Sequence, residues 1–370
     1  MNQSVDAEED DPVNEHPEPR SEQPSPSVSR RGMLRVGLGG AGLVGAAALT
    51  TRQGPSRSVG AQDSAPPSHD DHAPVMPAVV GEVDHAANGF DPSAILTDFN
   101  PGDEVSTLPT GQTLREYWIT AVNKEVEIVP GIVFPAWTYN GRIPGPTIRV
   151  TEGDRVRINF ENGSDHPHSM HFHGIHPGNM DGVFDAASGQ IPPGATFTYE
   201  FDAEPFGLHH YHCHTPPLAK HISKGLYGTF IVDPKDGWPP ADHEFVMVMS
   251  GFDIDFDGEN DFYVVNAIPF HYDHDKHPIK IKVGALVRVF LVNILEFDQS
   301  NSFHLHANFF HYYPTGTSRT PSEFTDTVAL MQGQRGILEF TYKYPGRYMF
   351  HAHKSEFAEL GWVGVFEVEE

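Results

Sequence analysis

Residues 146–162 read Pro146-Thr-Ile-Arg-Val-Thr-Glu-Gly-Asp-Arg-Val-Arg-Ile-Asn-Phe-Glu-Asn162, and a similar stretch returns as Pro278-Ile-Lys-Ile-Lys-Val-Gly-Ala-Leu-Val-Arg-Val-Phe-Leu-Val-Asn293. Three pairs of residues in these stretches share one spacing of 131 residues: Gly153 and Gly284, Arg157 and Arg288, and Asn162 and Asn293. From Tyr117 onward, short β-branched or aromatic runs alternate with Gly, Pro, Asn and Asp, a pattern typical of β-sandwiches. The simplest interpretation is a duplicated unit of about 120 residues. We therefore expect an all-β protein with two similar domains.

The repeat also sets the expected domain boundaries. Each half closes on a similar strand, Gly228-Thr-Phe-Ile-Val232 in the first and Gly364-Val-Phe-Glu-Val368 in the second. We expect domain one at residues 112–235 and domain two at residues 244–370, with Pro239-Pro240 in the linker. Residues 62–111 are then an N-terminal extension.

The N-terminal segment differs in composition from the repeat. Residues 1–28 are acidic, rich in proline and poor in large apolar side chains, so we expect them to be disordered. Arg30-Arg31 then stands before an uncharged stretch, residues 36–51, that is too short and too rich in glycine for a membrane span. This arrangement resembles a twin-arginine export signal. We expect residues 1–61 to form a disordered leader with this signal, no stable membrane span in the mature chain, and a periplasmic, cell-surface or extracellular location.

Composition narrows the function classes. The chain has 370 residues, with 23 histidines, one cysteine and a formal net charge of -26. The charge argues against a nucleic-acid partner, because a basic face would have to be built against the overall field. A single cysteine excludes a disulfide framework, an iron–sulfur cluster with four thiolates and a CxxC redox pair. Histidine is the commonest metal ligand, so its excess indicates a metalloprotein.

Four His-x-His pairs stand at matching places in the two halves. In a strand, residues i and i+2 point to the same face, so each pair presents two imidazoles together. Neutral imidazoles suit copper, zinc, iron or nickel, and the pairs alone do not choose among these metals. The pairs are His171 and His173, His212 and His214, His304 and His306, and His351 and His353.

The single cysteine narrows the choice of metal. Cys213 lies between His212 and His214, so its side chain points to the opposite face of the strand. His221 follows eight residues later, and His168 precedes the first pair. Two histidines and one thiolate are the trigonal ligand set of a blue-copper electron-transfer site.

Together, these motifs resemble those of the multicopper oxidases. The resemblance rests on His168-Ser-Met-His171-Phe-His173-Gly, His212-Cys213-His214 with His221 and Leu226, His304-Leu-His306 and His351-Ala-His353. It implies two cupredoxin-like Greek-key domains and four coppers per subunit: one type 1 copper and a trinuclear type 2/type 3 cluster. His168, Cys213 and His221 would hold type 1 copper, and His171 and His304 would hold type 2 copper. The type 3 pair would be bound by His173, His212, His214, His306, His351 and His353.

Domain two lacks the type 1 ligands. Ala352 aligns with Cys213, Asn301 stands where domain one has His168, and Phe357 falls where a second imidazole would lie. This pattern resembles the two-domain multicopper oxidases with type 1 copper in the first domain. That resemblance implies a homotrimer whose trinuclear sites lie between domain one of one subunit and domain two of the next.

The resemblance further implies a laccase-like enzyme that couples one-electron oxidation of a small organic donor or metal ion to reduction of dioxygen to water. Asp181 matches the acidic residue that delivers protons near the cluster, and Glu356 and Glu359 are further proton-relay candidates. Leu226 occupies the axial position of the type 1 site. Leucine cannot coordinate copper, so we expect a relatively high reduction potential.

Several alternatives stay open. A copper-containing nitrite reductase is also a two-domain trimer, but that family has an aspartate in place of His171 and no histidine at the place of His214. A metal-ion oxidase remains possible, although 9 methionines and no methionine-rich insert argue against a dedicated Cu(I) enzyme. A copper store or electron carrier would not need eight paired histidines. The spare histidines, including His271, His274 and His277, are interpreted as supporting or surface groups.

Overall fold

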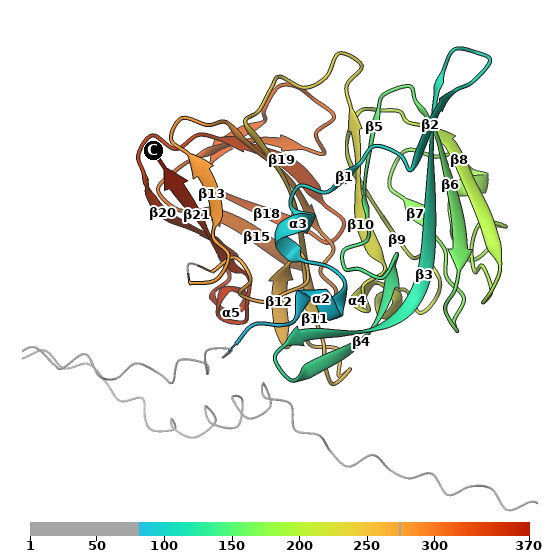
Figure 1. Cartoon of the computed structure of the whole chain (residues 1–370), viewed down its shortest axis with the longest axis horizontal. Helices are drawn as coiled ribbons and strands as arrows, with labels where there is room; N and C mark the ends of the chain where they lie inside the picture. The colour runs from blue at the N-terminus through green and yellow to red at the C-terminus, as the bar shows by residue number, and fades with distance from the viewer. Residues whose placement is uncertain (1–80, 274) are drawn as a thin grey trace, which may run out of the picture. The chain divides into compact units, whose positions relative to one another are not determined.

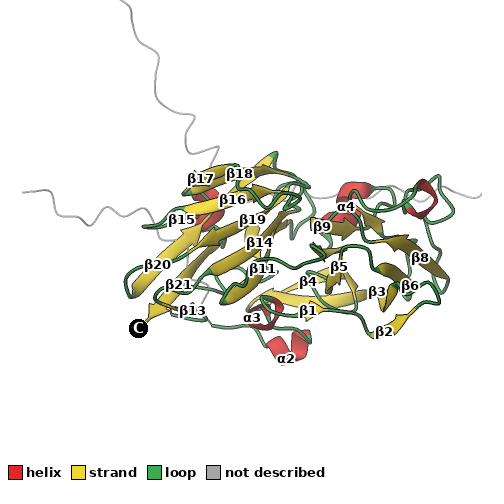
Figure 2. Ribbon diagram, turned by 90° about the horizontal axis from the view of Figure 1, so that it is seen from above, coloured by secondary structure: helices red, strands yellow, loops and turns green. Residues whose placement is uncertain are grey.

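The computed structural model describes residues 81–273 and 275–370. The predicted leader and export signal in residues 1–61 lie outside these residues, as do residues 62–80 of the predicted extension. The described chain is mainly β-strand, in four sheets, which confirms the all-β prediction (Figures 1 and 2).

Two sheets form the first sandwich. One has the strand order β1-β5-β10-β9-β7, and the other has the order β2-β3-β6-β8 with β4 paired to β3. The bounds of the first sheet are β1 Phe99–Asn100, β5 Thr147–Thr151, β10 Tyr227–Asp233, β9 Gly207–His212 and β7 His171–Phe172. Those of the second are β2 Glu104–Thr107, β3 Thr113–Val129, β6 Arg155–Asn162, β8 Thr196–Asp202 and β4 Ile132–Tyr139.

The other two sheets form the second sandwich. Their strand orders are β12-β11-β14-β19-β16-β17 and β13-β21-β20-β15-β18. The bounds of the first are β12 Phe262–Val265, β11 His243–Phe252, β14 Val287–Asn293, β19 Arg335–Phe340, β16 Phe310–Pro314 and β17 Glu323–Thr325. Those of the second are β13 Ile279–Lys282, β21 Val363–Glu369, β20 Gly346–His351, β15 Ser300–Leu305 and β18 Thr327–Met331.

The strand pairing repeats between the sandwiches. In the first, β5 runs parallel to β10, which pairs antiparallel with β9, which pairs antiparallel with β7. In the second, β13, β21, β20 and β15 are joined in the same way. The two similar sequence stretches form β5 with β6 and β13 with β14. The two halves of the sequence repeat therefore share one strand topology. The expected domain boundaries at 112–235 and 244–370 stay a prediction.

Helices are short and few in the described residues. They are α2 His85–Asn88, α3 Pro92–Ile95, α4 Leu218–Ser223, α5 Ser355–Glu359 and the 3-10 turn Gly178–Met180. None of the helices in the described part of the chain is long and apolar enough to cross a membrane.

Three apolar clusters hold these strands together. One lies between the sheets of each sandwich, and the third joins the two sandwiches. Strand β11 serves two of them, because Met247 and Met249 point into the second sandwich while Val246 and Val248 point into the joining cluster. The β3–β4 hairpin contributes Phe134 to the joining cluster. A strand buried on both faces explains the unbroken apolar run of β11.

The arginines of the sequence repeat have matching cross-strand partners. Arg157 on β6 bonds Glu116 at 3.0 Å and Glu200 at 2.6 Å, on the two flanking strands. Arg288 on β14 bonds Glu244 at 2.8 Å and Glu339 at 2.6 Å in the same register. The two sites differ in solvent exposure, since the Arg157 side chain is 31% exposed and that of Arg288 is 1% exposed.

The difference in exposure predicts unequal stability effects for the same substitution. Arg288→Ala should lower the free energy of unfolding by about 3–5 kcal/mol, because two carboxylates lose their buried partner. Arg157→Ala, the matched control, should lower it by about 1 kcal/mol or less. Urea denaturation followed by circular dichroism measures both. Equal losses in the two variants would contradict this assignment.

Candidate metal centres

The first candidate centre lies inside the first sandwich, at the end of β9. His168 follows β6, Cys213 follows β9 directly and His221 belongs to α4, and all three side chains are buried. The Cys213 Sγ atom lies 3.2 Å from His221 Nδ1 and 3.8 Å from His168 Nδ1, and the two nitrogens are 3.1 Å apart. The structure thus brings together the three residues that the sequence predicted as one ligand set.

A hydrogen-bond chain orients His168 for metal binding. The Ser164 hydroxyl donates to Asn123 Oδ1 at 2.6 Å and lies 2.9 Å from His168 Nε2. Because the hydroxyl proton is already used, Ser164 accepts the Nε2 proton, and the His168 lone pair lies on Nδ1, facing the thiol. Burial lowers the pKa of His168 to about 3 and that of His221 to about 4, so both rings are neutral.

Trp137 covers this centre, a role that sequence analysis missed. Its ring centroid lies 5.1 Å from that of His168 and 4.7 Å from that of His221. The partly exposed His166 packs on Trp137 at 4.6 Å, and Lys220 Nζ lies 5.4 Å from the indole centroid. No sequence motif marks Trp137, because it lies on β4, remote in sequence from the ligands.

The axial candidate Leu226 and the thiol belong to one apolar environment. Leu226 and Cys213 are both fully buried in the cluster between the sheets of the first sandwich. The Leu226 carbonyl accepts a hydrogen bond from Cys213 N at 3.0 Å. Burial raises the pKa of the Cys213 thiol. Only a metal or another strong positive charge would favour the thiolate in such surroundings.

The second candidate centre is formed by the four paired histidines of the first sandwich. Strands β7 and β9 pair so that His171 lies opposite His212. The His171 ring centroid is 5.0 Å from that of His173 and 5.0 Å from that of His214. His173 Nε2 and His212 Nε2 approach to 3.0 Å. Burial lowers the pKa of His212 to about 3, which keeps this ring neutral.

The second sandwich repeats this group. His304 lies opposite His351 in the pairing of β15 with β20. His306 Nε2 and His351 Nε2 approach to 2.9 Å, and His304 contacts the His353 ring at 5.0 Å between centroids. In the described part of the chain, ring contacts join the histidines within each group, and none joins the two groups.

Hydrogen bonds to backbone carbonyls define which ring nitrogen of four of these histidines is available to bind a metal. His171 Nδ1 lies 2.8 Å from the Asp181 carbonyl, and His212 Nδ1 lies 2.9 Å from that of Cys213. In the second sandwich, His304 Nδ1 lies 3.0 Å from the Asp326 carbonyl and His351 Nδ1 lies 2.7 Å from that of Ala352. A carbonyl only accepts, so each Nδ1 is protonated and each Nε2 lone pair is free to bind a metal. Asp326 was not identified from the sequence.

In the second sandwich, apolar side chains fill the position that corresponds to the thiol centre. Ala352 N bonds the Trp362 carbonyl as Cys213 N bonds that of Leu226, which confirms that the two positions correspond. Phe357, in the place of His221, is fully buried and stacks on Tyr263 at 3.7 Å between centroids. The donor atoms are therefore replaced by apolar packing.

The three predicted proton-relay carboxylates differ in their surroundings. Asp181 Oδ1 lies 2.9 Å from His171 Nδ1 and 3.3 Å from His176 Nε2, so this carboxylate contacts a histidine of the second centre. Glu356 pairs with Lys354 at 3.5 Å, and Glu359 is exposed at the end of α5. His176 was counted as a spare histidine in the sequence, but it shares Asp181 with His171.

Two residues at the seam between the sandwiches also border the second centre. His210 is buried, and its ring centroid lies 3.7 Å from that of His173. Arg335, from β19 of the second sandwich, donates to the Leu208 carbonyl on β9 at 2.9 Å. Burial lowers the pKa of both His173 and His210, and the charge of the half-buried Arg335 lowers both further. Sequence analysis missed this contact, since 127 residues separate Arg335 from Leu208.

Comparison with known proteins agrees with this geometry. Two family models described as multicopper oxidase match residues 121–237 and 247–370. A solved structure described as the crystal structure of multicopper oxidase is 60% identical, with a TM-score of 0.76, and covers 78% of this chain and 100% of its own.

Two curated relatives carry different activities in their names. A copper-containing nitrite reductase from Neisseria meningitidis is 31% identical over 249 residues, which are 63% of this chain. The chain spans 63% of the length of that relative. Laccase-8 from Oryza sativa subsp. japonica is 29% identical over 250 residues, covering 59% of this chain and 43% of its own.

Removal of the Ser164 hydroxyl should weaken metal binding at the thiol centre. Ser164→Ala removes the acceptor of the His168 Nε2 proton, so metal affinity at the thiol centre should fall by about 10–100-fold. Competition with a chelator on the purified protein measures this loss. Ser223→Ala is the control, because the Ser223 hydroxyl bonds a carbonyl of its own helix at 3.3 Å. Equal retention in both variants would refute the orienting role.

Proposed function

Since the chain belongs to the multicopper oxidase family, we propose that it is a laccase-like enzyme that couples oxidation of phenolic or similar donors to reduction of dioxygen to water. The observation that carries this proposal is the doubled histidine group. In each sandwich, two histidines donate their Nδ1 proton to a backbone carbonyl and present Nε2 as a ligand.

The donor sets fit copper in two kinds of centre. His168, Cys213 and His221 provide the two nitrogens and one sulfur that suit type 1 copper. His171 and His304 would hold type 2 copper, and His173, His212, His214, His306, His351 and His353 would hold the type 3 pair. When four coppers are bound, they supply one-electron oxidation of the donor and four-electron reduction of dioxygen.

The protein would hold and connect these centres. Cys213 is covalently continuous with His212 and His214, so electrons have a short route through bonds from the thiol to the paired histidines. Burial of Cys213 and Leu226 excludes water from the thiol centre. Leu226 offers no axial ligand atom, which favours the reduced state and a high potential.

Donor electrons would enter beside Trp137, which packs on both His168 and His221. Lys220 Nζ and Lys224 Nζ lie 5.4 and 5.3 Å from the indole centroid. Lys220 is exposed whereas Lys224 is buried, so the Lys220 ammonium group would repel a metal cation at this surface and tolerate a phenol or phenolate. This charge pattern favours an organic donor over a metal-ion substrate.

Asp181 is the preferred proton carrier for the reaction. Its carboxylate contacts His171 and His176, so it can pass protons toward the paired histidines. Glu356 and Glu359 remain weaker candidates, because the recorded ion pair of Glu356 is with Lys354 and Glu359 is exposed.

Nitrite reduction is the second candidate, favoured by the similarity to the Neisseria meningitidis enzyme. Against it, His171 and His214 are both present, with ring centroids 5.0 Å apart. A single type 2 copper would not need the remaining paired histidines. The oxidase is therefore the better supported of the two functions.

Activity and copper content of the full-length protein test the proposal. With a phenolic donor, the copper-loaded wild type should consume oxygen and leave nitrite unchanged. Cys213→Ser should lose the blue absorption and donor-driven oxygen uptake while keeping the coppers on the paired histidines, because serine is a poor ligand for this soft site. Two coppers per chain together with nitrite turnover would overturn the assignment.

We further propose that the protein is exported through the twin-arginine route, because Arg30-Arg31 stands before an uncharged stretch. We also propose that the protein is a homotrimer. The trimer is supported by two histidine groups with recorded ring contacts inside each group. A cyclic assembly would unite one group with the other group of a neighbouring copy.

Subunit mixing tests the trimer. His171→Ala and His304→Ala should each be inactive, and their mixture after dissociation and reassembly should regain about a quarter of wild-type activity, because one interface in four combines two intact halves. A mixture of His171→Ala with His212→Ala is the control and should stay inactive. Failure of the first mixture to regain any activity, in trimers verified by sedimentation, would contradict shared sites.

A further inference from the structure

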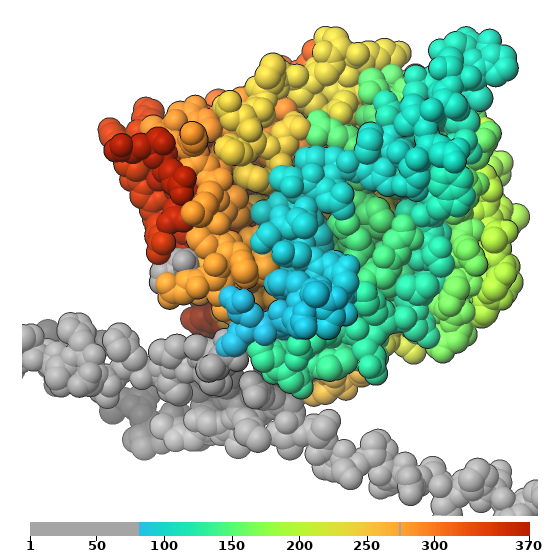
Figure 3. All heavy atoms as spheres, in the orientation of Figure 1, coloured from blue at the N-terminus to red at the C-terminus, as the bar shows by residue number. Residues whose placement is uncertain are grey.

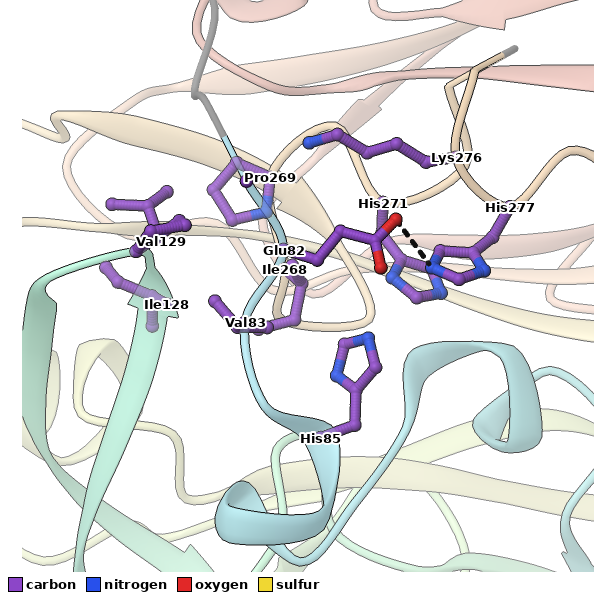
Figure 4. A pocket seen from close by; sticks show the side chains of 12 residues that line it. Glu82, Val83, His85, Ile128, Val129, Ile268, Pro269, His271, Lys276 and His277 are labelled. Atoms are coloured by element: carbon purple, nitrogen blue, oxygen red, sulfur yellow. Dashed lines mark ion pairs between the residues drawn. The ribbon is translucent and has the colours of Figure 1, made fainter.

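A third group of histidines lies outside both centres described above. His85 begins α2, whereas His271 and His277 belong to the loop between β12 and β13. One ligand nitrogen from each of the three lies within 4.8 Å of the others. Figure 4 shows His271 and His277 side by side, with His85 below them and the Glu82 carboxylate beside His277.

Within residues 81–273 and 275–370, two of these imidazoles have buried nitrogens without a hydrogen-bond partner. They are His85 Nδ1 and His277 Nε2, and His277 Nε2 lies 3.7 Å from Glu82 Oε1. Buried polar atoms are normally satisfied, so each exception needs an explanation. The cavity that the group lines has a volume of about 20 Å³, enough for one occupant the size of a water molecule.

His271 is oriented as a metal ligand would be. Its Nε2 atom lies 2.8 Å from Ser93 Oγ and 3.6 Å from Asp91 Oδ1. A carboxylate and a hydroxyl on one ring nitrogen favour a proton there, which leaves the lone pair on Nδ1. Burial lowers the pKa of His271 to about 2, so the ring is neutral and unsuited to binding an anion.

We propose that His85, His271 and His277, together with Glu82, form a binding site for one divalent transition metal ion, separate from the copper centres. Three imidazoles and a carboxylate are ligands that zinc accepts in a tetrahedral site. With Zn–N bonds of about 2.0–2.1 Å, the nitrogens would be about 3.4 Å apart. They already lie within 4.8 Å of one another, so binding needs a closure of at most about 1.4 Å.

The site lies where it would join the two sandwiches. Asn88, at the end of α2, exchanges two hydrogen bonds with Glu127 of β3, at 2.8 and 3.0 Å. His271 and His277 instead belong to the second sandwich, so a metal bound to His85 links α2 to it. Figure 3 shows this N-terminal segment in blue across the boundary between green and orange atoms. Metal binding would therefore stabilise the association of the sandwiches.

Zinc binding to the copper-loaded, full-length protein tests this proposal. After dialysis against zinc, elemental analysis should find one zinc per chain in addition to copper, and zinc should raise the temperature of unfolding. His85→Gln and His277→Gln should lose this zinc and the thermal shift at unchanged copper content. His311→Gln, a substitution of an exposed histidine on β16, is the matched control and should keep both.

Variants with altered charge test the zinc site even if a histidine variant fails to fold. Glu82→Gln should weaken zinc binding by about tenfold or more, because a negative ligand is lost. Lys276→Gln should tighten binding, since the ammonium group lines the same cavity and its charge acts on His271. Zinc binding that is absent, or equal in wild type, Glu82→Gln and Lys276→Gln, would overturn the proposal. Phosphate binding without zinc binding would also overturn it.

Discussion

The alternation of side chains at the end of β9 is the constraint on which both kinds of metal centre depend. The rings of His212 and His214 stack with centroids 5.7 Å apart, on one face of the chain. Cys213 between them points to the other face, into the apolar cluster of the first sandwich. The thiol and the two imidazoles therefore lie on opposite faces of the chain, so the two candidate centres are separate yet adjacent.

A second constraint is the use of backbone carbonyls to hold the rings. In both sandwiches, the first histidine of the earlier pair donates to an aspartate carbonyl, Asp181 or Asp326. The first histidine of the later pair donates to the carbonyl of the next residue, Cys213 or Ala352. Because these carbonyls belong to the main chain at turns and strand ends, ring orientation is set by the fold and requires few additional side chains.

The duplicated halves diverged by packing as much as by ligand loss. Arg157 and Arg288 keep the same partners in register, but the joining cluster buries Arg288 and leaves Arg157 partly exposed. In the second sandwich, Phe357 and Ala352 fill the space that His221 and Cys213 occupy in the first. The first sandwich therefore keeps the buried thiol centre, whereas the second has apolar core packing at the same position. The strand topology is the same in both.

The all-β class, the duplication and the grouping of the paired histidines were readable from sequence, because strand periodicity and the 131-residue spacing are local or repeated signals. The sequence also placed the loss of the thiol in the second half. Only the tertiary structure decided that Trp137 covers the thiol centre, that Arg335 borders the paired histidines, and that His85 meets His271 and His277. These contacts join segments that are remote along the chain and carry no spacing pattern. Burial of the joining apolar cluster brings Arg335 and His85 to their partners across the seam, whereas burial of the cluster inside the first sandwich brings Trp137 to the thiol centre.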